Sequence, residues 1–121
     1  MTPKEFYDAI GGDYADALSR LMNDTFIIKF IGKFKDDKNY GELKKCIENG
    51  DFDNAFSYSH TFKGVALNLS FKRLSEAAVN LTDALRKPVR NTLTQERAEK
   101  LLAEVTKEYI TVTENIKKLC D

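Results

Sequence analysis

Three residues whose chemistry fits together, His60, Lys63 and Gly64, follow one another at helical spacing near the middle of the chain. His60 is the only histidine among 121 residues, with the lysine three positions later and the glycine four positions later. Residues at i, i+3 and i+4 are neighbours on a helix surface, so these three should form one patch. The patch would combine an imidazole nucleophile, a fixed positive charge and backbone without a side chain. This combination indicates a site that accepts a phosphoryl group.

Each residue of the patch would have its own role in that reaction. A donor must bring a negatively charged group in line with the imidazole, so His60 has to be exposed. Lys63 can place its ammonium against the oxygens of the transferred group. Glycine inside a helix lowers helix stability by about 1 kcal/mol relative to alanine. Gly64 would be tolerated because, without a side chain there, a partner's surface can approach the imidazole. Leu67 would add apolar docking area beside it, and Asn68 a polar contact.

Taken singly, none of the three residues is informative. A lone helical histidine is usually an ordinary surface residue, Lys63 could simply be solvated, and Gly64 could mark a close helix crossing. Their joint spacing on one helix carries the prediction.

Length and composition are those of a single domain, which we expect to span residues 1–121. Hydrophobic residues make up 42% of the chain and charged residues 31%, a balance typical of an ordinary globular protein. The 19 basic residues match 19 acidic ones, so no net charge attracts nucleic acid or anionic lipid. No apolar run reaches the roughly 18 residues of a membrane span, and the first residues lack the pattern of a secretory signal. We therefore expect a cytoplasmic protein that binds neither nucleic acid nor membrane.

Other reactive groups are few. The two cysteines, Cys46 and Cys120, lie far apart and predict reduced thiols. The sequence has no His/Cys cluster for a metal and no Gly-rich motif for a nucleotide, so we expect no metal and no cofactor. No acid stands three or four residues from His60 to orient its ring, and a hydrolase with His60 as general base has little support.

Capping and breaking residues mark the helix boundaries. The expected N-caps are Thr2, Asp13, Asn23 and Asp51. The expected stops are Gly11–Gly12, the polar connection 35–38, Asn49–Gly50 and Pro88. Ser70 either caps the helix that follows it or marks a bend.

Apolar residues at steps of three and four predict the core. In the third helix the expected buried stripe is Phe26, Ile27, Phe30, Ile31 and Phe34, and Met22 should lie on the apolar face of the helix before it. The helix with His60 should run from about Phe52 to Leu69. Its expected core stripe is Phe52, Ala55, Phe56, Ser59, Phe62, Ala66 and Leu69. Helical geometry places His60 about 100° from the centre of that stripe, on an accessible flank.

These patterns together predict the fold. The last 25 or so residues form another amphipathic helix, no alternating stretch predicts a strand, and no segment repeats another. The fold class is therefore all-α, an antiparallel up-and-down four-helix bundle with short additional N-terminal helices. Since every apolar stripe can face inward, we expect a monomer.

The stretch SHTFKGVALNL, residues 59–69, closely resembles the phosphoacceptor helix of histidine-containing phosphotransfer (HPt) domains, whose pattern is approximately A-H-x-L-K-G-x-x-x-x-L-G. Residues 47–51 (IENGD) are similar to the family's approach to that helix, and residues 74–81 (LSEAAVNL) to the helix after it. The correspondence covers roughly residues 26–87, and the last helix matches only in type. Ser59 stands where Ala is usual, and Ser70 stands where Gly usually follows the leucine, which leaves the turn geometry open there.

The resemblance implies a bundle whose exposed histidine takes a phosphoryl group from the aspartyl phosphate of a response-regulator receiver domain and passes it to a second receiver. His60 would be the phosphoacceptor that forms phosphohistidine, Lys63 the cation on the phosphoryl oxygens, and Gly64 the clearance residue at the docking face. The implied partners are response-regulator receiver domains, a sensor histidine kinase, or both, and the kinase could be of the hybrid type. Divalent metal would belong to the receiver. The chain would be a phosphoryl carrier in two-component signal transduction, not an enzyme with ATP-dependent kinase activity.

Two other functions remain open. The chain could be a phosphoacceptor domain that resembles the N-terminal part of chemotaxis-type kinases, phosphorylated in trans by an ATP-binding domain. It could also be a helical adaptor that docks receivers and never carries phosphate. The start at Met1 and the helical C-terminus favour a free-standing protein over a domain of a hybrid kinase.

Overall fold

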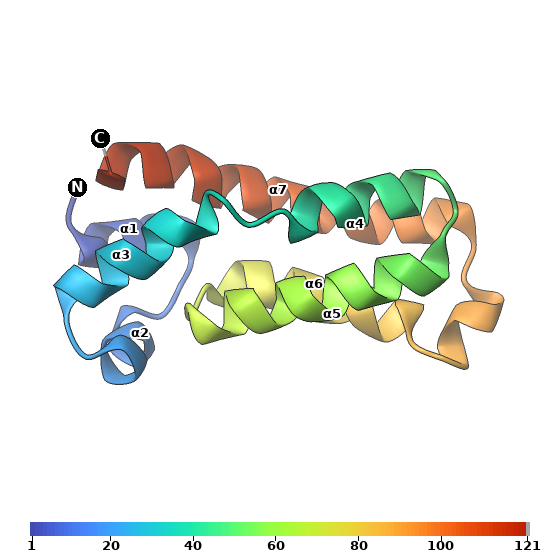
Figure 1. The fold of residues 1–121 in the computed structure, drawn as a ribbon, viewed down its shortest axis with the longest axis horizontal. Coiled ribbons are helices and arrows are strands. Elements are labelled where there is room, and N and C mark those ends of the chain that lie inside the picture. Colours follow the sequence, from blue (N-terminus) through green and yellow to red (C-terminus); the bar gives the residue numbers. More distant parts are fainter. Residues whose placement is uncertain (121) are drawn as a thin grey trace.

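The chain forms a set of helices joined by short turns (Figure 1). The computed structural model describes residues 1–120, which contain seven α-helices, one 3-10 helix and no strand. The elements are α1 (Pro3–Ile10), α2 (Tyr14–Leu21), α3 (Asp24–Phe34), α4 (Asn39–Glu48), α5 (Phe52–Asn68), α6 (Lys72–Leu85), η1 (Val89–Thr92) and α7 (Gln95–Cys120). The predicted all-α class is confirmed.

Four helices make the bundle, and each packs against the next along the chain. α4 contacts α5, α5 contacts α6, α6 contacts α7, and α7 returns to α4. α7 runs the length of the molecule, with α3 and α4 lying one after the other along it (Figure 1). The short helices α1 and α2 pack at the end of the bundle where α3 lies. The predicted antiparallel four-helix bundle with short N-terminal helices is confirmed.

Local capping chemistry sets where several of these helices begin and end. In the four N-caps that the sequence predicted, the side chain accepts a hydrogen bond from the backbone N–H three residues later, which satisfies a donor that the helix itself cannot. These N-caps are Thr2, Asp13, Asn23 and Asp51. Gly11 and Gly50 adopt left-handed angles, with φ of 66° and 70°, directly after α1 and after the last turn of α4. The sequence therefore predicted these boundaries from chemistry that acts over a few residues.

The core behind α5 is aromatic. Phe62 on α5 is fully buried, and its ring centroid lies 6.1 Å from those of Phe34 and Tyr40 and 6.0 Å from that of Tyr109. One side chain of α5 thus contacts α3, α4 and α7. The α5 stripe is buried as predicted at Ala55, Ser59, Phe62, Ala66 and Leu69, and half-buried at Phe52 and Phe56.

Three apolar residues that we expected on buried faces are exposed. Met22, Phe26 and Phe30 have exposed fractions of 76%, 40% and 37%. α2 ends at Leu21, and Met22 follows with a φ of 78°, which turns the chain out of the helix. α3 lies at one end of the bundle, so only one of its two apolar rows faces the neighbours α1, α2 and α7. That buried row is Ile27, Ile31 and Phe34.

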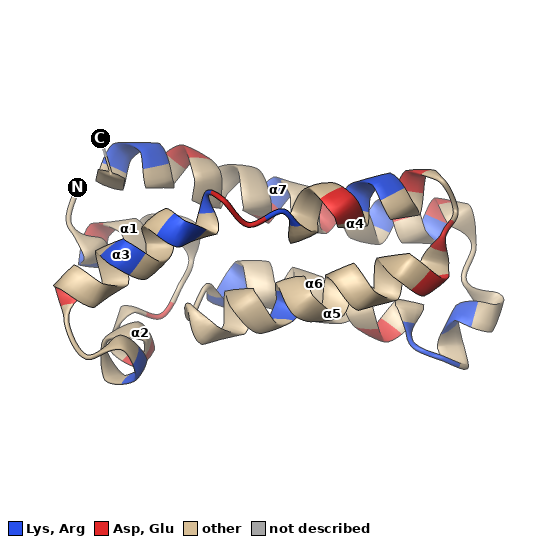
Figure 2. Ribbon diagram, in the orientation of Figure 1, with Lys and Arg blue, Asp and Glu red and all other residues tan. Residues whose placement is uncertain are grey.

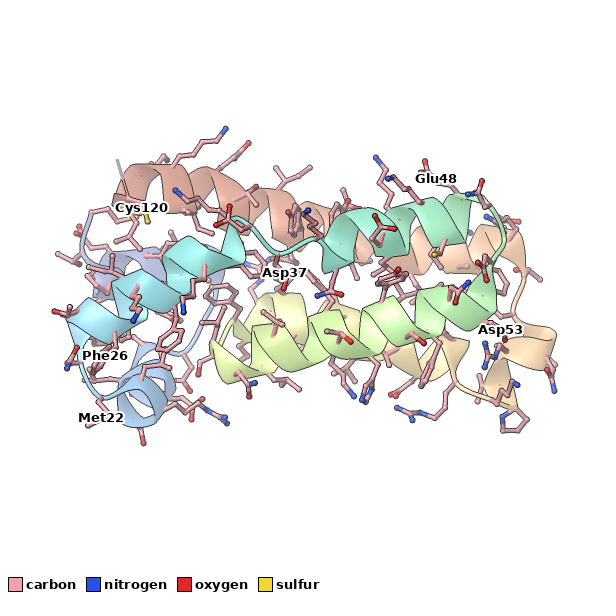
Figure 3. The ribbon with its side chains drawn as sticks, in the orientation of Figure 1. Met22, Phe26, Asp37, Glu48, Asp53 and Cys120 are labelled. Carbon is pink, nitrogen blue, oxygen red and sulfur yellow. The ribbon has the colours of Figure 1, made fainter. Side chains whose placement is uncertain are left out.

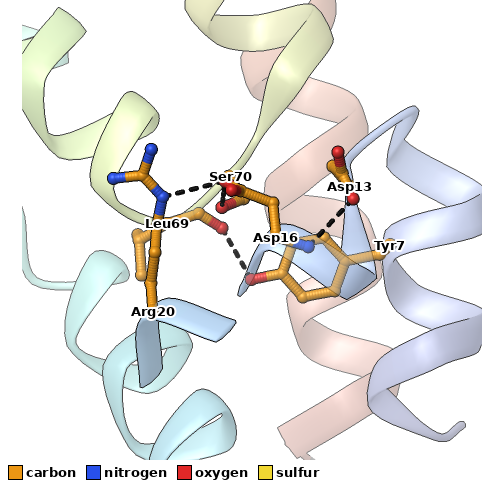
Figure 4. A network of polar contacts seen from close by, with 6 residues as sticks. All are labelled: Tyr7, Asp13, Asp16, Arg20, Leu69 and Ser70. Atoms are coloured by element: carbon orange, nitrogen blue, oxygen red, sulfur yellow. Dashed lines mark hydrogen bonds and ion pairs between the residues drawn. The ribbon is translucent and has the colours of Figure 1, made fainter. Parts of the chain in front are cut away.

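Ser70 joins the α5–α6 turn to the N-terminal helices. Its φ of 60° is in the left-handed region that favours glycine, and its hydroxyl donates to the carboxylate of Asp16 at 2.6 Å. The Ser70 carbonyl accepts from the backbone N–H of Asp13 at 3.0 Å, and the Tyr7 hydroxyl donates to the Leu69 carbonyl at 2.7 Å (Figure 4). Of the two alternatives left open for Ser70, the cap on α6 is wrong. That helix begins after Phe71 without a side-chain cap, because the Ser70 hydroxyl is already bonded to α2.

This network predicts a pH-dependent contribution to stability. The Ser70 hydroxyl and then the Arg20 guanidinium hold the pKa of Asp16 below its ordinary value. A carboxyl whose pKa is lowered by folding stabilises the fold above its unfolded-state pKa, about 3.9, and loses that contribution as the pH falls through the folded-state pKa. We expect Asp16→Asn to melt at a lower temperature than the unsubstituted protein at pH 7, with the gap narrowing toward pH 3. Thermal melts followed by circular dichroism at several pH values would measure this, and a gap independent of pH would contradict it.

Candidate functional site

α5 carries the three residues predicted to act together and presents them to solvent. His60 is exposed, and Lys63 and Gly64, one turn further on, are half-buried. Positions i, i+3 and i+4 are surface neighbours on a helix, so the ammonium and the bare backbone lie next to the imidazole. Leu67, 44% exposed, and Asn68 continue the exposed surface of α5 toward its C-terminus. The predicted exposure of His60 is confirmed.

Gly64 borders open space. A Cβ atom built at this position would meet no atom of a neighbouring element within 4 Å among the described residues. The alternative that a helix crosses closely at Gly64 is therefore wrong. The missing side chain instead leaves the backbone of α5 accessible beside His60, and α5 tolerates a residue that lowers helix stability by about 1 kcal/mol.

Lys63 provides the positive charge of this helix. Between Asp53 in its first turn and its end at Asn68, α5 contains Lys63 as its only Lys, Arg, Asp or Glu, and most of its ribbon is uncharged in Figure 2. An anion that approaches His60 meets this cation without a carboxylate from the same part of α5. A charge placed in this way can stabilise the oxygens of a phosphoryl group as it transfers.

A buried hydrogen bond fixes the back of α5 at this level. The hydroxyls of Ser59 and Thr82 lie 2.6 Å apart and join α5 to α6. Thr82 donates its own hydroxyl proton to the Ala78 carbonyl at 2.7 Å, so Ser59 is the donor between the two hydroxyls. Ser59 is thereby satisfied inside the core, one residue before the exposed His60. The bond restricts rotation of α5 about its own axis relative to α6.

The structure also places Phe56 beside His60, and two arginines against Phe56, and the sequence predicted neither contact. The Phe56 ring lies one turn before the imidazole, with ring centroids 5.9 Å apart. The guanidinium groups of Arg86 and Arg90 lie over the same Phe56 ring. The i, i+4 spacing from Phe56 to His60 is a signal that could have found the first contact. The arginines lie 26 and 30 residues after His60, and no local pattern connects them to it.

A groove of about 310 Å³ opens beside the C-terminal half of α5. Its lining comes from α2, α3, the residues after α3, and α5, and consists of Leu21, Phe30, Lys33, Phe34, Asp37, Val65, Asn68 and Leu69. Met22 and Phe26 line an adjoining hollow that shares Leu21 and Phe30 with the groove. These two side chains lie at the end of the molecule where α2 meets α3 (Figure 3). The exposed apolar side chains of Met22, Phe26 and Phe30 thus continue to the helix that carries His60.

The two outer residues predicted for docking face different hollows. Asn68 lines the groove shared with α3. Leu67 borders a smaller hollow of about 130 Å³ with residues of α2, the α5–α6 turn and the start of α6, among them Asp16 and Ser70. Successive residues on a helix differ in direction by about 100°, which separates the two side chains. Both stay exposed, one on each side of the end of α5.

Metal ligands and thiols are other groups that carry chemistry in proteins. Within residues 1–120, no group of three or more His, Cys, Asp or Glu side chains is placed to hold a metal ion. Burial, and then the charges of Asp51 and Glu42, raise the pKa of the Cys46 thiol, which keeps it protonated at neutral pH.

None of the helices within residues 1–120 has the length and apolar character needed to cross a membrane.

Comparison with known proteins gives one kind of match. A family model described as "Hpt domain" matches residues 29–115, a range that holds His60, Lys63 and Gly64 and leaves α1 and α2 outside. No curated protein and no solved structure matches the chain.

Proposed function

The chain belongs to the Hpt domain family, and from that premise we propose that it relays a phosphoryl group between receiver aspartates through a phosphohistidine at His60. Membership of the family implies phosphotransfer in two-component systems by a phosphoryl carrier that is not a kinase. The observation that carries the finer proposal is the exposed His60, with Lys63 and the open position Gly64 one turn away on α5.

The proposed reaction needs few groups from this chain. A ring nitrogen of neutral His60 attacks the phosphorus of a receiver aspartyl phosphate, the N–P bond forms, and the P–O bond to the aspartate breaks to release its carboxylate. Lys63 stabilises the phosphoryl oxygens during the transfer. Attack by the aspartate of a second receiver on the same phosphorus reverses these steps and frees the imidazole. Divalent metal is supplied by the receiver.

The proposed docking face lies around Gly64, with Leu67 and Asn68 on its two sides. The absent side chain at Gly64 lets the receiver's surface come close to the imidazole. The groove between α3 and α5 then offers apolar area, with one cation, Lys33, and one carboxylate, Asp37, in its lining. The partners are receiver domains or a sensor histidine kinase that carries one. We further propose that residues 1–121 act as one domain, as a monomer in the cytoplasm, with no nucleic acid or membrane as partner.

A phosphotransfer assay tests this function. A receiver domain charged with radioactive phosphate is mixed with the protein, and the label that moves to it is tested in acid and in alkali. Label that is lost in acid and kept in alkali supports a phosphohistidine relay. Label that comes only from a separate ATP-bound kinase domain would point to the chemotaxis-type acceptor. No label from either source would leave a receiver-binding adaptor.

Lys63→Ala should slow transfer about 10-fold to 100-fold, the scale expected for losing one charge-assisted contact to the phosphoryl oxygens. The protein should bind receivers and melt much as before, because Lys63 is a partly exposed residue that contributes to charge more than to packing. Rapid-quench measurement of the transfer rate at saturating receiver would show the loss. Lys44→Ala removes an exposed lysine from α4 and serves as the control. Equal transfer rates for Lys63→Ala and Lys44→Ala would show that Lys63 does not take part in the transfer.

A further inference from the structure

The imidazole of His60 rests beside an aromatic ring from its own helix. Phe56 precedes His60 by one turn of α5, with ring centroids 5.9 Å apart and ring planes inclined by only 24°. This distance and angle belong to the offset-stacked arrangement that aromatic pairs prefer. Phe56 is half-buried, so neighbouring side chains restrict its ring. His60 is exposed, and its ring projects into solvent beside that of Phe56.

Two arginines from outside α5 hold the Phe56 ring. The guanidinium carbon of Arg86, the residue directly after α6, lies 5.3 Å from the ring centroid. That of Arg90, in η1, lies 5.8 Å from it. Cations over an aromatic face are attracted by its electron density, more strongly where water is excluded. The ring is therefore attached to α5, to the end of α6 and to η1 at once.

Arg90 is itself anchored. Its guanidinium forms an ion pair with Asp53 in the first turn of α5, and its side chain is only 13% exposed. Its Nε is buried without a hydrogen-bond partner among the described residues. The ion pair and the burial of the side chain leave Arg90 little freedom to move away from the ring. The Asp53–Arg90 contact thus ties η1 to the same face of α5 that carries Phe56.

The imidazole has no local acid to orient it. The residues three and four positions from His60 on α5 are Phe56, Ser57, Lys63 and Gly64. In sites where histidine is the reacting group, a hydrogen-bonded carboxylate or carbonyl commonly fixes the ring. Here the neighbour with a defined ring-to-ring geometry is Phe56.

We propose that Phe56 is a positioning residue for phosphotransfer, whose ring, held by Arg86 and Arg90, keeps the His60 imidazole in the orientation that receives the phosphoryl group. This inference rests on the proposed function, because it concerns the rate of that reaction. Its physical basis is that an attacking atom displaced from the line of approach loses a large part of its rate. Phe56 acts through His60 and makes no bond to phosphorus.

The kinetic test compares three variants. Phe56→Leu keeps an apolar side chain and removes the ring, and it should lower the transfer rate at saturating receiver about 10-fold with the receiver Kd unchanged. Phe56→Tyr restores a ring and should return the rate to within about 2-fold. Phe52→Leu removes a half-buried aromatic residue from the first turn of the same helix and should leave the rate unchanged. Arg86→Gln keeps the Phe56 ring but removes one of the two cations that hold it, and it should lower the rate in the same direction, by about 2-fold to 3-fold.

A second readout needs no phosphate. NMR signals of the His60 ring protons in the unphosphorylated protein carry the ring-current shift of Phe56. Phe56→Leu should abolish this shift, Phe56→Tyr should keep it, and Arg86→Gln should reduce it. Thermal melting of each variant confirms that it is folded.

The outcomes separate this inference from the proposed function. If the unsubstituted protein takes no phosphoryl group, the relay fails and the positioning role fails with it. If it is labelled but Phe56→Leu transfers as fast, the relay stands and Phe56 has no positioning role. A loss shared equally by Phe52→Leu, or one that Phe56→Tyr does not rescue, would show general packing and would also overturn the inference.

Discussion

His60→Gln should abolish phosphoryl transfer to the chain while the bundle stays folded. The amide of glutamine has no nucleophilic nitrogen, so the N–P bond cannot form. His60 is exposed, and exposed substitutions outside caps and cores usually change stability by no more than about 0.5 kcal/mol. The measurement is the label transferred from a charged receiver, read together with the melting temperature. We expect no label above background and an unchanged melt.

Matched controls make that result specific. Thr61→Ala removes an exposed hydroxyl from the next residue of α5 and should leave labelling intact. Binding of unphosphorylated receiver should persist in His60→Gln, because its contacts lie around Gly64 and the neighbouring groove. Acid-stable label on His60→Gln would place the acceptor on a hydroxyl and contradict the proposed site. Full biological activity of His60→Gln would identify an adaptor.

Substitutions at Gly64 should separate stability from docking. A Cβ at this position meets open space, so Gly64→Ala adds no clash within the chain and should stabilise the protein by about 0.5–1 kcal/mol through helix propensity. Gly64→Gln adds a longer side chain that starts in the same open space. It would occupy the space through which a receiver approaches His60, and we expect its Kd for receiver to rise at least about 10-fold. Denaturant unfolding and receiver titration measure the two effects.

Gly41→Ala is the control for this prediction. Gly41 also has open space at its Cβ position, but it lies on α4. Gly41→Ala should stabilise the protein by no more than Gly64→Ala does, and it should leave receiver binding unchanged. Wild-type transfer rates and receiver affinity in Gly64→Gln would show that clearance at this position has no role.

The chain's own sequence determined the local framework of the site. Side-chain caps and glycine stops act over three or four residues, and they fixed where α1, α2, α3 and α5 begin. The apolar period on α5 then placed Phe62 in the core and His60 on the exposed flank, because both follow from one helical repeat. The spacing of Lys63 and Gly64 relative to His60 needs nothing beyond that helix.

The tertiary structure alone decided which apolar faces are covered. Two apolar rows on α3 look equivalent in sequence, and only the packing of α3 at the end of the bundle leaves Phe26 and Phe30 exposed. Ser70 could not be assigned from its type, since its hydroxyl is bonded to Asp16, 54 residues earlier in the chain. The contacts of Arg86 and Arg90 with Phe56 likewise join segments about 30 residues apart. Such contacts depend on how whole helices pack, and a periodicity of three to four residues carries no information about them.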